Sequence, residues 1–197
     1  MRSNRRKLLL TLVVLGLLGS IAGWATFSAF SATTSNTGNS FAAGTVSITD
    51  NDSNSAMLSL ANAAPNATDT GCIKVDYTGS LNSTVRLYST VTGSLAAYLT
   101  VVVTRGTDSS PSFDSCTNFT ADATNYISQG AGVIYSGLLS AFPANYTAGI
   151  VDPFSGSPET WTTSEAHSYR FVVTLNDDTA AQGLSSTAAF TWEARNL

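Results

Sequence analysis

Charged residues are scarce in this sequence. They make up 11% of its 197 residues, where about 25% is usual for a globular protein. Polarity comes from Ser, Thr and Asn instead, and hydrophobic residues, at 43%, are too many for a disordered chain. The length suits one domain with a sizeable core or two small ones. Because hydroxyl and β-branched side chains fit pleated strands, the composition favours an extracellular β-protein.

Basic residues are nearly absent beyond the start of the chain. Four of the nine are Arg2, Arg5, Arg6 and Lys7. The rest of the chain holds five basic residues against thirteen acidic ones, a formal net charge of −8. Binding to nucleic acid requires clustered Lys and Arg, and so does docking on anionic lipid. We therefore expect no nucleic-acid partner and no membrane contact beyond the N-terminal segment.

The residues of familiar catalytic sites are also missing. His167 is the single histidine, and the chain contains neither an HExxH zinc motif nor a G-x-S-x-G nucleophile elbow. His167 begins an expected strand and is predicted to be a surface residue. Asp177 and Asp178 are predicted to lie in a solvated turn or cap. The sequence therefore predicts no catalytic residue, no zinc site and no cofactor.

One short acidic stretch is a candidate calcium site. Asp50, Asp52 and Asn54 are spaced like the first ligands of a calcium-binding loop. The EF-hand pattern then fails, because Ser55 stands where Gly is required and Ala61 where Glu is required. A polar turn after a strand explains the same residues, so both interpretations stay open.

The chain has two cysteines, Cys72 and Cys116. An even number in an exported chain favours a disulfide. The bond would enclose 43 residues, and the chain-entropy treatment gives it roughly 4 kcal/mol of stabilisation. Two buried free thiols are the alternative.

The N-terminus has the order of a secretion signal. A basic start, Met1–Lys7, precedes a 17-residue apolar run, Leu8–Trp24, and small residues follow. We expect an N-terminal signal helix here and a secreted or cell-surface protein. The run is somewhat short for a membrane-spanning helix, which needs about 20 residues, but retention as an N-terminal anchor is the alternative.

Two positions fit cleavage by a signal peptidase. A cut between Ser28 and Ala29 makes residues 1–28 the signal peptide, and a cut between Ala25 and Thr26 is the alternative. No cysteine follows the apolar run, so a lipid-anchored lipoprotein is not supported.

Alternation of apolar and polar residues runs through the rest of the chain. The clearest segments are Cys72–Tyr77, Thr84–Tyr88, Leu99–Arg105, Tyr169–Leu175 and Phe190–Arg195. Weaker strand candidates are Gly44–Ile48, Met57–Leu60 and Gly132–Leu138. Short strands separated by turn residues predict an all-β fold, an antiparallel jelly-roll or immunoglobulin-like sandwich over residues 46–197.

The remaining segments are predicted to be irregular. Thr107–Gly132 and Leu139–Ala166 are expected to be long surface loops that decorate the sandwich, one of them fixed by the disulfide. Residues Leu95–Leu99 are expected to form one turn of helix.

Three groups of residues add a family resemblance. The first joins Thr26–Ser31 to Phe41–Val46, and the second joins Leu60–Pro65 to Tyr77–Leu81. The third is C-terminal and consists of Tyr169–Phe171, Asp177-Asp178, Gln182-Gly183 and a Phe190-x-Trp192-x-Ala194 strand. Together they resemble the TasA/camelysin family of secreted biofilm-matrix proteins.

The resemblance implies a structural protein. In that family, a SipW-type signal peptidase processes a jelly-roll subunit, and the mature N-terminal segment of one subunit is donated as a strand to the next in an extracellular fibre. Here the donor would be residues 29–45, with Ala29, Phe30, Phe41 and Thr45 among them. An added strand satisfies the free N–H and C=O groups of an open sheet edge, and head-to-tail contacts grow filaments. The expected partners are therefore copies of this chain and, during export, the signal peptidase.

Other interpretations remain open. Residues 29–45 also fit a disordered leader or the first strand of their own domain. The camelysin branch carries a metalloprotease label, although zinc ligands are not recognisable in this sequence. A monomeric surface-binding module held by an uncleaved N-terminus, or an accessory subunit of another fibre, fits the same residues.

Overall fold

The computed structural model describes residues 43–153 and 159–197. The expected signal helix, both cleavage positions and the expected donor up to Ala42, including Ala29, Phe30 and Phe41, lie outside the described residues.

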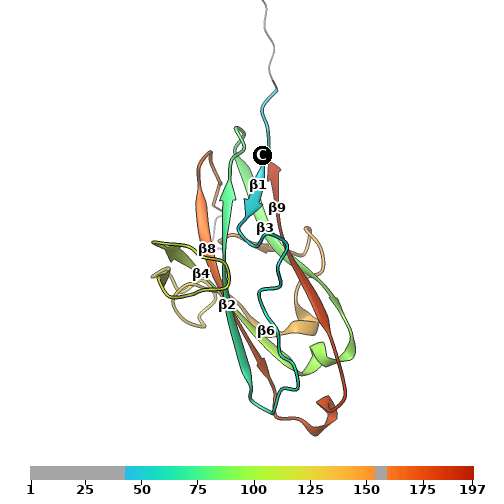
Figure 1. Cartoon of the computed structure of the whole chain (residues 1–197). Coiled ribbons are helices and arrows are strands. Elements are labelled where there is room, and N and C mark those ends of the chain that lie inside the picture. Colours follow the sequence, from blue (N-terminus) through green and yellow to red (C-terminus); the bar gives the residue numbers. More distant parts are fainter. Residues whose placement is uncertain (1–42, 154–158) are drawn as a thin grey trace, which may run out of the picture. The chain divides into compact units, whose positions relative to one another are not determined.

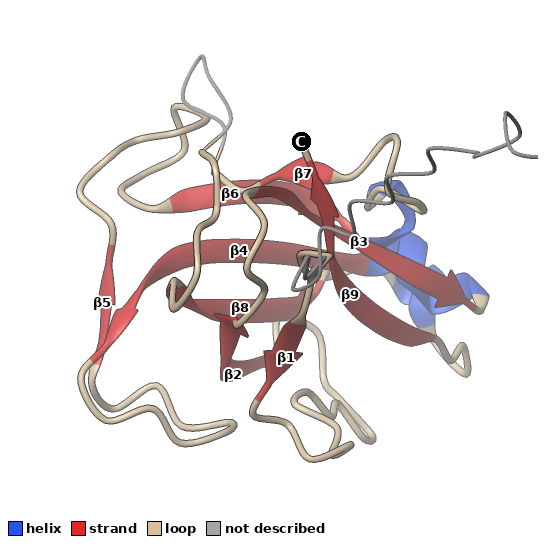
Figure 2. Ribbon diagram, turned by 90° about the horizontal axis from the view of Figure 1, so that it is seen from above, coloured by secondary structure: helices blue, strands red, loops and turns tan. Residues whose placement is uncertain are grey.

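Two antiparallel sheets form a sandwich (Figure 1). The larger sheet runs β1 (Ile48–Asp50), β2 (Thr68–Tyr77), β8 (Ala166–Leu175), β4 (Leu99–Asp108), and both β5 (Phe119–Ala121) and β6 (Val133–Leu138) pair with β4. The smaller sheet runs β7 (Ile150–Val151), β3 (Ser83–Thr92), β9 (Thr187–Asn196). Figure 2 shows β6, β4, β8 and β2 in this order across the larger sheet. The predicted all-β antiparallel sandwich is confirmed.

The chain passes repeatedly from one sheet to the other. It passes from β2 to β3, from β3 to β4 and from β8 to β9, each time into the other sheet. Short 3-10 helices lie at strand ends, η1 (Ser94–Tyr98), η2 (Leu139–Ala141) and η3 (Thr179–Ala181). The expected turn of helix near Leu95–Leu99 is therefore confirmed as η1.

The core follows the alternation of the sequence. Each long strand directs every second side chain between the sheets, and these side chains are fully or nearly fully buried: Val75 and Tyr77, Val85 and Leu87, Val101 and Val103, Tyr169 and Phe171. Aromatic rings close the centre, with ring centroids 4.6 Å apart for Phe171 and Phe190 and 5.1 Å apart for Tyr169 and Trp192. Burial of each large apolar side chain contributes about 1.5–3 kcal/mol, which makes this layer the main source of stability.

Two of the weaker strand predictions are wrong in whole or in part. Met57–Leu60 is irregular, although its apolar side chains still contact the core. Of Gly44–Ile48, only Ile48 belongs to a strand, because β1 begins at Ile48 and continues to Asp50. The third prediction, Gly132–Leu138, is confirmed by β6.

The two long loops do more than decorate the surface. The segment Thr107–Gly132 contains β5, and Leu139–Ala166 contains β7. Trp161 and Asp152, both from the second loop, are completely buried. The prediction of purely surface loops is therefore wrong for these residues, because Trp161 packs in the hydrophobic core and Asp152 pairs with the buried Arg105.

Both described chain ends lie at the same end of the sandwich (Figure 1). Thr45 is tied there: its C=O accepts hydrogen bonds from the N–H groups of Ser80 (2.9 Å) and Leu81 (3.1 Å). Leu197 bonds to the carbonyl of Asn82 beside them. The expected donor segment thus ends at about Gly44, because Thr45 belongs to its own domain.

Candidate functional site

β9 is an open edge strand of the smaller sheet. On the far side of β3 from β9, Ser83 exchanges two backbone hydrogen bonds with Trp161, of 3.0 and 2.8 Å, so its β9 partner Asn196 belongs to a non-hydrogen-bonded pair. Bonded and non-bonded pairs alternate along an antiparallel ladder. The backbone N–H and C=O groups that point away from β3 therefore belong to Ala188, Phe190, Trp192 and Ala194. Within the described residues these groups have no backbone partner.

A groove follows this open edge between the two sheets. Its upper part, about 250 Å³, is lined by β1, Val75 and residues 190–192. Its lower part, about 330 Å³, is lined by residues 56–60 and by Ser186, Thr187, Ala188 and Phe190. The buried indole N–H of Trp192 has no acceptor in the described part of the chain. The lower part of the β9 edge is thus bordered by mainly apolar space, and the upper part by more polar surface and the unsatisfied indole N–H of Trp192.

Residues 52–66, here called the cover segment, lie over this groove. Figure 1 shows the cover segment in teal, descending between β2 and β9 from β1 to the start of β2. Four of its side chains, those of Met57, Leu58, Leu60 and Ala63, pack on the core while remaining partly exposed. The seam between the sheets is closed here by an irregular segment instead of a paired strand.

The four family-motif residues all lie along this side of the domain. Gln182 and Gly183 line a cavity of about 520 Å³ at the lower end, together with Leu60 and Leu99. Gly183 has a φ of 73°, a left-handed conformation that favours glycine. Phe190 and Trp192 are the core-facing residues of the open strand β9. The motif therefore shapes the end cavity and the open edge, and it places no nucleophile there.

The acidic pair beside this cavity behaves as predicted. Asp177 and Asp178 are exposed. The Asp178 carboxylate accepts a 2.8 Å hydrogen bond from the N–H of Ala180 and caps η3.

A buried charged cluster lies at the opposite end of β4. Arg105 continues the inward alternation of its strand and is 5% exposed. Its guanidinium donates to Asp122 (2.5 Å) and Glu159 (2.7 Å), and its Nε lies 3.2 Å from the fully buried Asp152. Tyr169 also donates a 2.6 Å hydrogen bond to Asp152. The cluster joins both long loops to the larger sheet.

Burial and ion pairing oppose each other within this cluster. Burial acts against the charge of Arg105, but the neighbouring carboxylates, Asp152 first, raise its pKa further above the usual value. Burial raises the pKa of Asp152, and attraction to Arg105 and the Tyr169 hydroxyl partly offset this effect. Burial is also the main cause that raises the pKa of Tyr169 well above its usual range. The charged groups of this cluster are thus stabilised by ion pairs and hydrogen bonds with one another.

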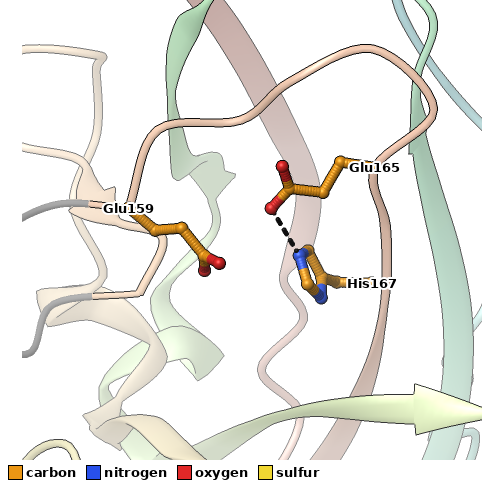
Figure 3. Close-up of side chains that lie close together, drawn as sticks. All are labelled: Glu159, Glu165 and His167. Atoms are coloured by element: carbon orange, nitrogen blue, oxygen red, sulfur yellow. Dashed lines mark hydrogen bonds and ion pairs between the residues drawn. The ribbon is translucent and has the colours of Figure 1, made fainter.

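Three side chains in this region have the composition of a metal site. Glu159, Glu165 and His167 place possible ligand atoms within 4.8 Å of one another (Figure 3). The prediction of His167 as a surface residue is therefore wrong, since its side chain is only 14% exposed. The sequence analysis did not predict this cluster, because the carboxylates Glu159 and Glu165 lie in a segment that was expected to be a surface loop.

The cluster does not fit a zinc ion well. Arg105 Nη2 lies 2.7 Å from both Glu159 Oε2 and His167 Nε2. A Zn²⁺ ion binds such atoms at about 2.0–2.2 Å, so it would compete with a buried guanidinium for two of its three ligands. The arginine already supplies the positive charge that these groups face.

The candidate calcium residues form a self-contained polar turn. Asp50 Oδ1 accepts from the N–H of Asp52 (3.2 Å), and Asp52 Oδ1 accepts from the N–H of Asn54 (2.7 Å). Asn54 has a positive φ of 63°, which tightens the turn. Burial raises the pKa of Asp50, and this opposes ionisation. The polar-turn interpretation explains each of these contacts.

The predicted disulfide between Cys72 and Cys116 is confirmed, with Cα atoms 5.2 Å apart. Cys72 lies on the outer face of β2, and Cys116 brings the Thr107–Gly132 loop across the sheet to it. Phe119 of the same loop lies under the guanidinium of Arg170, 5.1 Å from the ring centroid.

No protein-family model matches the chain, and no curated protein matches it either. None of the helices in residues 43–153 and 159–197 is long and apolar enough to span a membrane.

Proposed function

We propose that this chain is a secreted structural subunit of extracellular fibres, which polymerises head to tail by donating its N-terminal segment as a strand. The observation that carries the proposal is the open edge of β9. Its unpaired backbone groups and the groove beside it offer the hydrogen bonds and the apolar contacts that an added strand uses.

The donor is long enough for this edge. β9 has ten residues, about 33 Å when extended, and residues 29–44 reach about 50 Å at the same rise of about 3.3 Å per residue. The segment therefore pairs with all of β9 and still bridges the gap between two domains. It is uncharged and rich in Ser and Thr, so it adds no buried charge to the groove.

The two ends of the domain make the contact directional. The donor segment joins the domain at the end where β9 finishes, beside Leu197. In a linear stack it enters the next copy at the other end, where β9 begins at Thr187. It then runs antiparallel to β9, the commoner arrangement for neighbouring strands. A contact between two different surfaces of this kind does not close on itself and grows filaments.

The resemblance to the TasA/camelysin family supports the same function, because its most specific residues, Phe190 and Trp192, lie on the open strand. The competing protease interpretation has less support, since Arg105 Nη2 already lies 2.7 Å from both Glu159 and His167 of the one His-containing acidic cluster among the described residues.

The test is electron microscopy of the secreted mature protein beside a variant that begins at Gly44. We expect filaments from the mature protein and monomers from the shortened one. Monomers from both, under varied pH and salt, would overturn self-polymerisation, and a surface-binding or accessory module would replace it. An N-terminus found still attached to its apolar run would favour the anchored module.

A further inference from the structure

The middle of the cover segment, from Ala56 to Ala63, is nearly free of backbone hydrogen bonds. Its two ends are fixed, because the N–H of Ser55 donates to the C=O of Asp52 (2.9 Å) and the N–H of Asn66 donates to the C=O of Leu175 in β8 (2.8 Å). Between Ala56 and Ala63, the one hydrogen bond within the described residues runs from the N–H of Ser59 to Asp69 Oδ2, at 2.5 Å. No ladder connects this stretch to β2 or β9. It is held chiefly by apolar side chains that are only partly buried. Such a segment detaches at lower cost than a paired strand.

The cover segment and an incoming strand need the same space. A strand paired with β9 lies about 4.7–4.9 Å from it. The lower groove is bounded by Ala56–Leu60 on one side and by β9 on the other, and holds about 330 Å³. That volume is at the low end for a pocket that holds one small molecule, about 300–1,000 Å³, and is too small for a strand of several residues.

Building on the proposed function, we propose that the cover segment occupies the strand-acceptor position in the free subunit and is displaced when a donor strand pairs with β9. The partner at this site is the segment 29–44 of a second copy. The cover segment shields the apolar seam beside an edge strand, which otherwise invites pairing with any exposed chain. The donor replaces it because the donor adds ladder hydrogen bonds that the cover segment lacks.

The Asp69–Ser59 contact sets how readily the cover opens. Hydrogen bonds to charged groups are the stronger ones, and this one fixes the middle of the cover segment to β2. Asp69 belongs to β2 and not to β9, so replacing Asp69 leaves intact the backbone groups of β9 that would pair with a donor strand.

Displacement is measured with a thiol at the cover. Both native cysteines are bonded to each other, so Met57→Cys introduces a single free thiol at a partly buried position. We expect maleimide to label it at least tenfold faster in filaments than in monomers. Equal or slower labelling in filaments would overturn the inference while leaving the proposed fibre function in place.

A second measurement follows filament growth by light scattering in the full mature chain. Asp69→Ala is expected to speed growth about tenfold, the effect of losing the Ser59 hydrogen bond to a charged acceptor; the variant also loses the local bond from the Thr70 N–H within β2. Asp108→Ala is the matched control, because Asp108 also accepts a backbone hydrogen bond, from Ser110, and the variant loses the same charge. Equal rates of filament growth for Asp69→Ala and Asp108→Ala would overturn the inference that the cover segment must be displaced. An unaltered chain that forms no filaments overturns the proposed function, and this inference with it.

Discussion

The Arg105–Asp152 pair is the most deeply buried ion pair among the described residues. Arg105→Met leaves the fully buried Asp152 without its cation, and an uncompensated buried charge costs about 3–5 kcal/mol. We expect urea denaturation to show a loss of stability of that size. The double variant Arg105→Met/Asp152→Asn removes both charges and keeps an acceptor for Tyr169, so it is expected to recover most of the loss.

The matched control for this prediction is Arg195→Met. Arg195 is also paired with a carboxylate, that of Glu193 at 2.7 Å, but its side chain is 57% exposed. Exposed pairs contribute about 0–1 kcal/mol. Similar losses for Arg105→Met and Arg195→Met would contradict the view that burial gives the Arg105 cluster its importance.

The alternation of β4 contains a signal for this cluster. Arg105 falls on the inward position of the alternation Leu99, Val101, Val103, where a charged residue is unexpected. A buried arginine requires carboxylates around it. The identity of those carboxylates was not predictable, because Asp152 lies 47 positions further along the chain, beyond β5, β6 and β7.

Among the elements, β9 is the one in which substitutions test strand addition most directly. The N–H of Ala188 points to the open edge, whereas that of Ala189 points to Thr90 of β3. Proline removes an N–H and is tolerated on the free side of an edge strand. Ala188→Pro is therefore expected to keep the melting temperature within a few degrees and to abolish filaments in electron micrographs.

Ala189→Pro is the matched control, one residue away. It breaks a hydrogen bond of the β3–β9 ladder and is expected to lower the melting temperature clearly more than Ala188→Pro does. Filaments from Ala188→Pro at the normal rate would show that the donor strand does not use this edge.

The disulfide fixes one long loop as an element of the fold. Replacing Cys72 and Cys116 together by serine releases the Thr107–Gly132 loop from β2, and we expect a loss of about 2–4 kcal/mol in urea denaturation. Limited proteolysis by chymotrypsin should then cut near Phe113 or Phe119 before the sheets unfold. Resistance to this cleavage would mean that the β4–β5 pairing and the Arg105–Asp122 ion pair hold the loop without the disulfide.

The elements were predictable where burial and alternation coincide. Segments such as Cys72–Tyr77 and Tyr169–Leu175 bury one face in a ladder, so their period of two is diagnostic. Met57–Leu60 shows why the weaker prediction failed. Its apolar side chains contact the core across the seam, but its backbone forms no ladder with β2 or β9, and a four-residue pattern does not distinguish these cases.

At the scale of the whole domain, the proposed function assigns different roles to its two ends. The proposed donor segment joins the domain at the end that contains Thr45 and Leu197. The groove along β9 begins at the opposite end, near Gln182 and Gly183. The acceptor was not predictable from the sequence, because an edge strand and a central strand share one alternation and only the topology separates them. The donor, by contrast, was inferred from sequence and family resemblance alone.

The two roles are separable in one mixing experiment. A chain that begins at Gly44 retains the acceptor and lacks the donor, and Ala188→Pro retains the donor and lacks the acceptor. We expect each to be monomeric alone in size-exclusion chromatography. Their equimolar mixture is expected to give a complex of two chains and nothing longer, because its free donor and free acceptor have both been removed.

When either variant is added in small amounts to filaments of the unaltered protein, it is expected to block further growth. The chain that begins at Gly44 blocks one end of the filament, and Ala188→Pro blocks the opposite end. Head-to-tail growth requires this behaviour, since each addition consumes one donor and one acceptor. A symmetric contact predicts otherwise: the Gly44 chain would pair with itself, and the mixture would contain its dimers. Two-chain complexes that form only in the mixture would therefore distinguish strand donation from any association between equivalent surfaces.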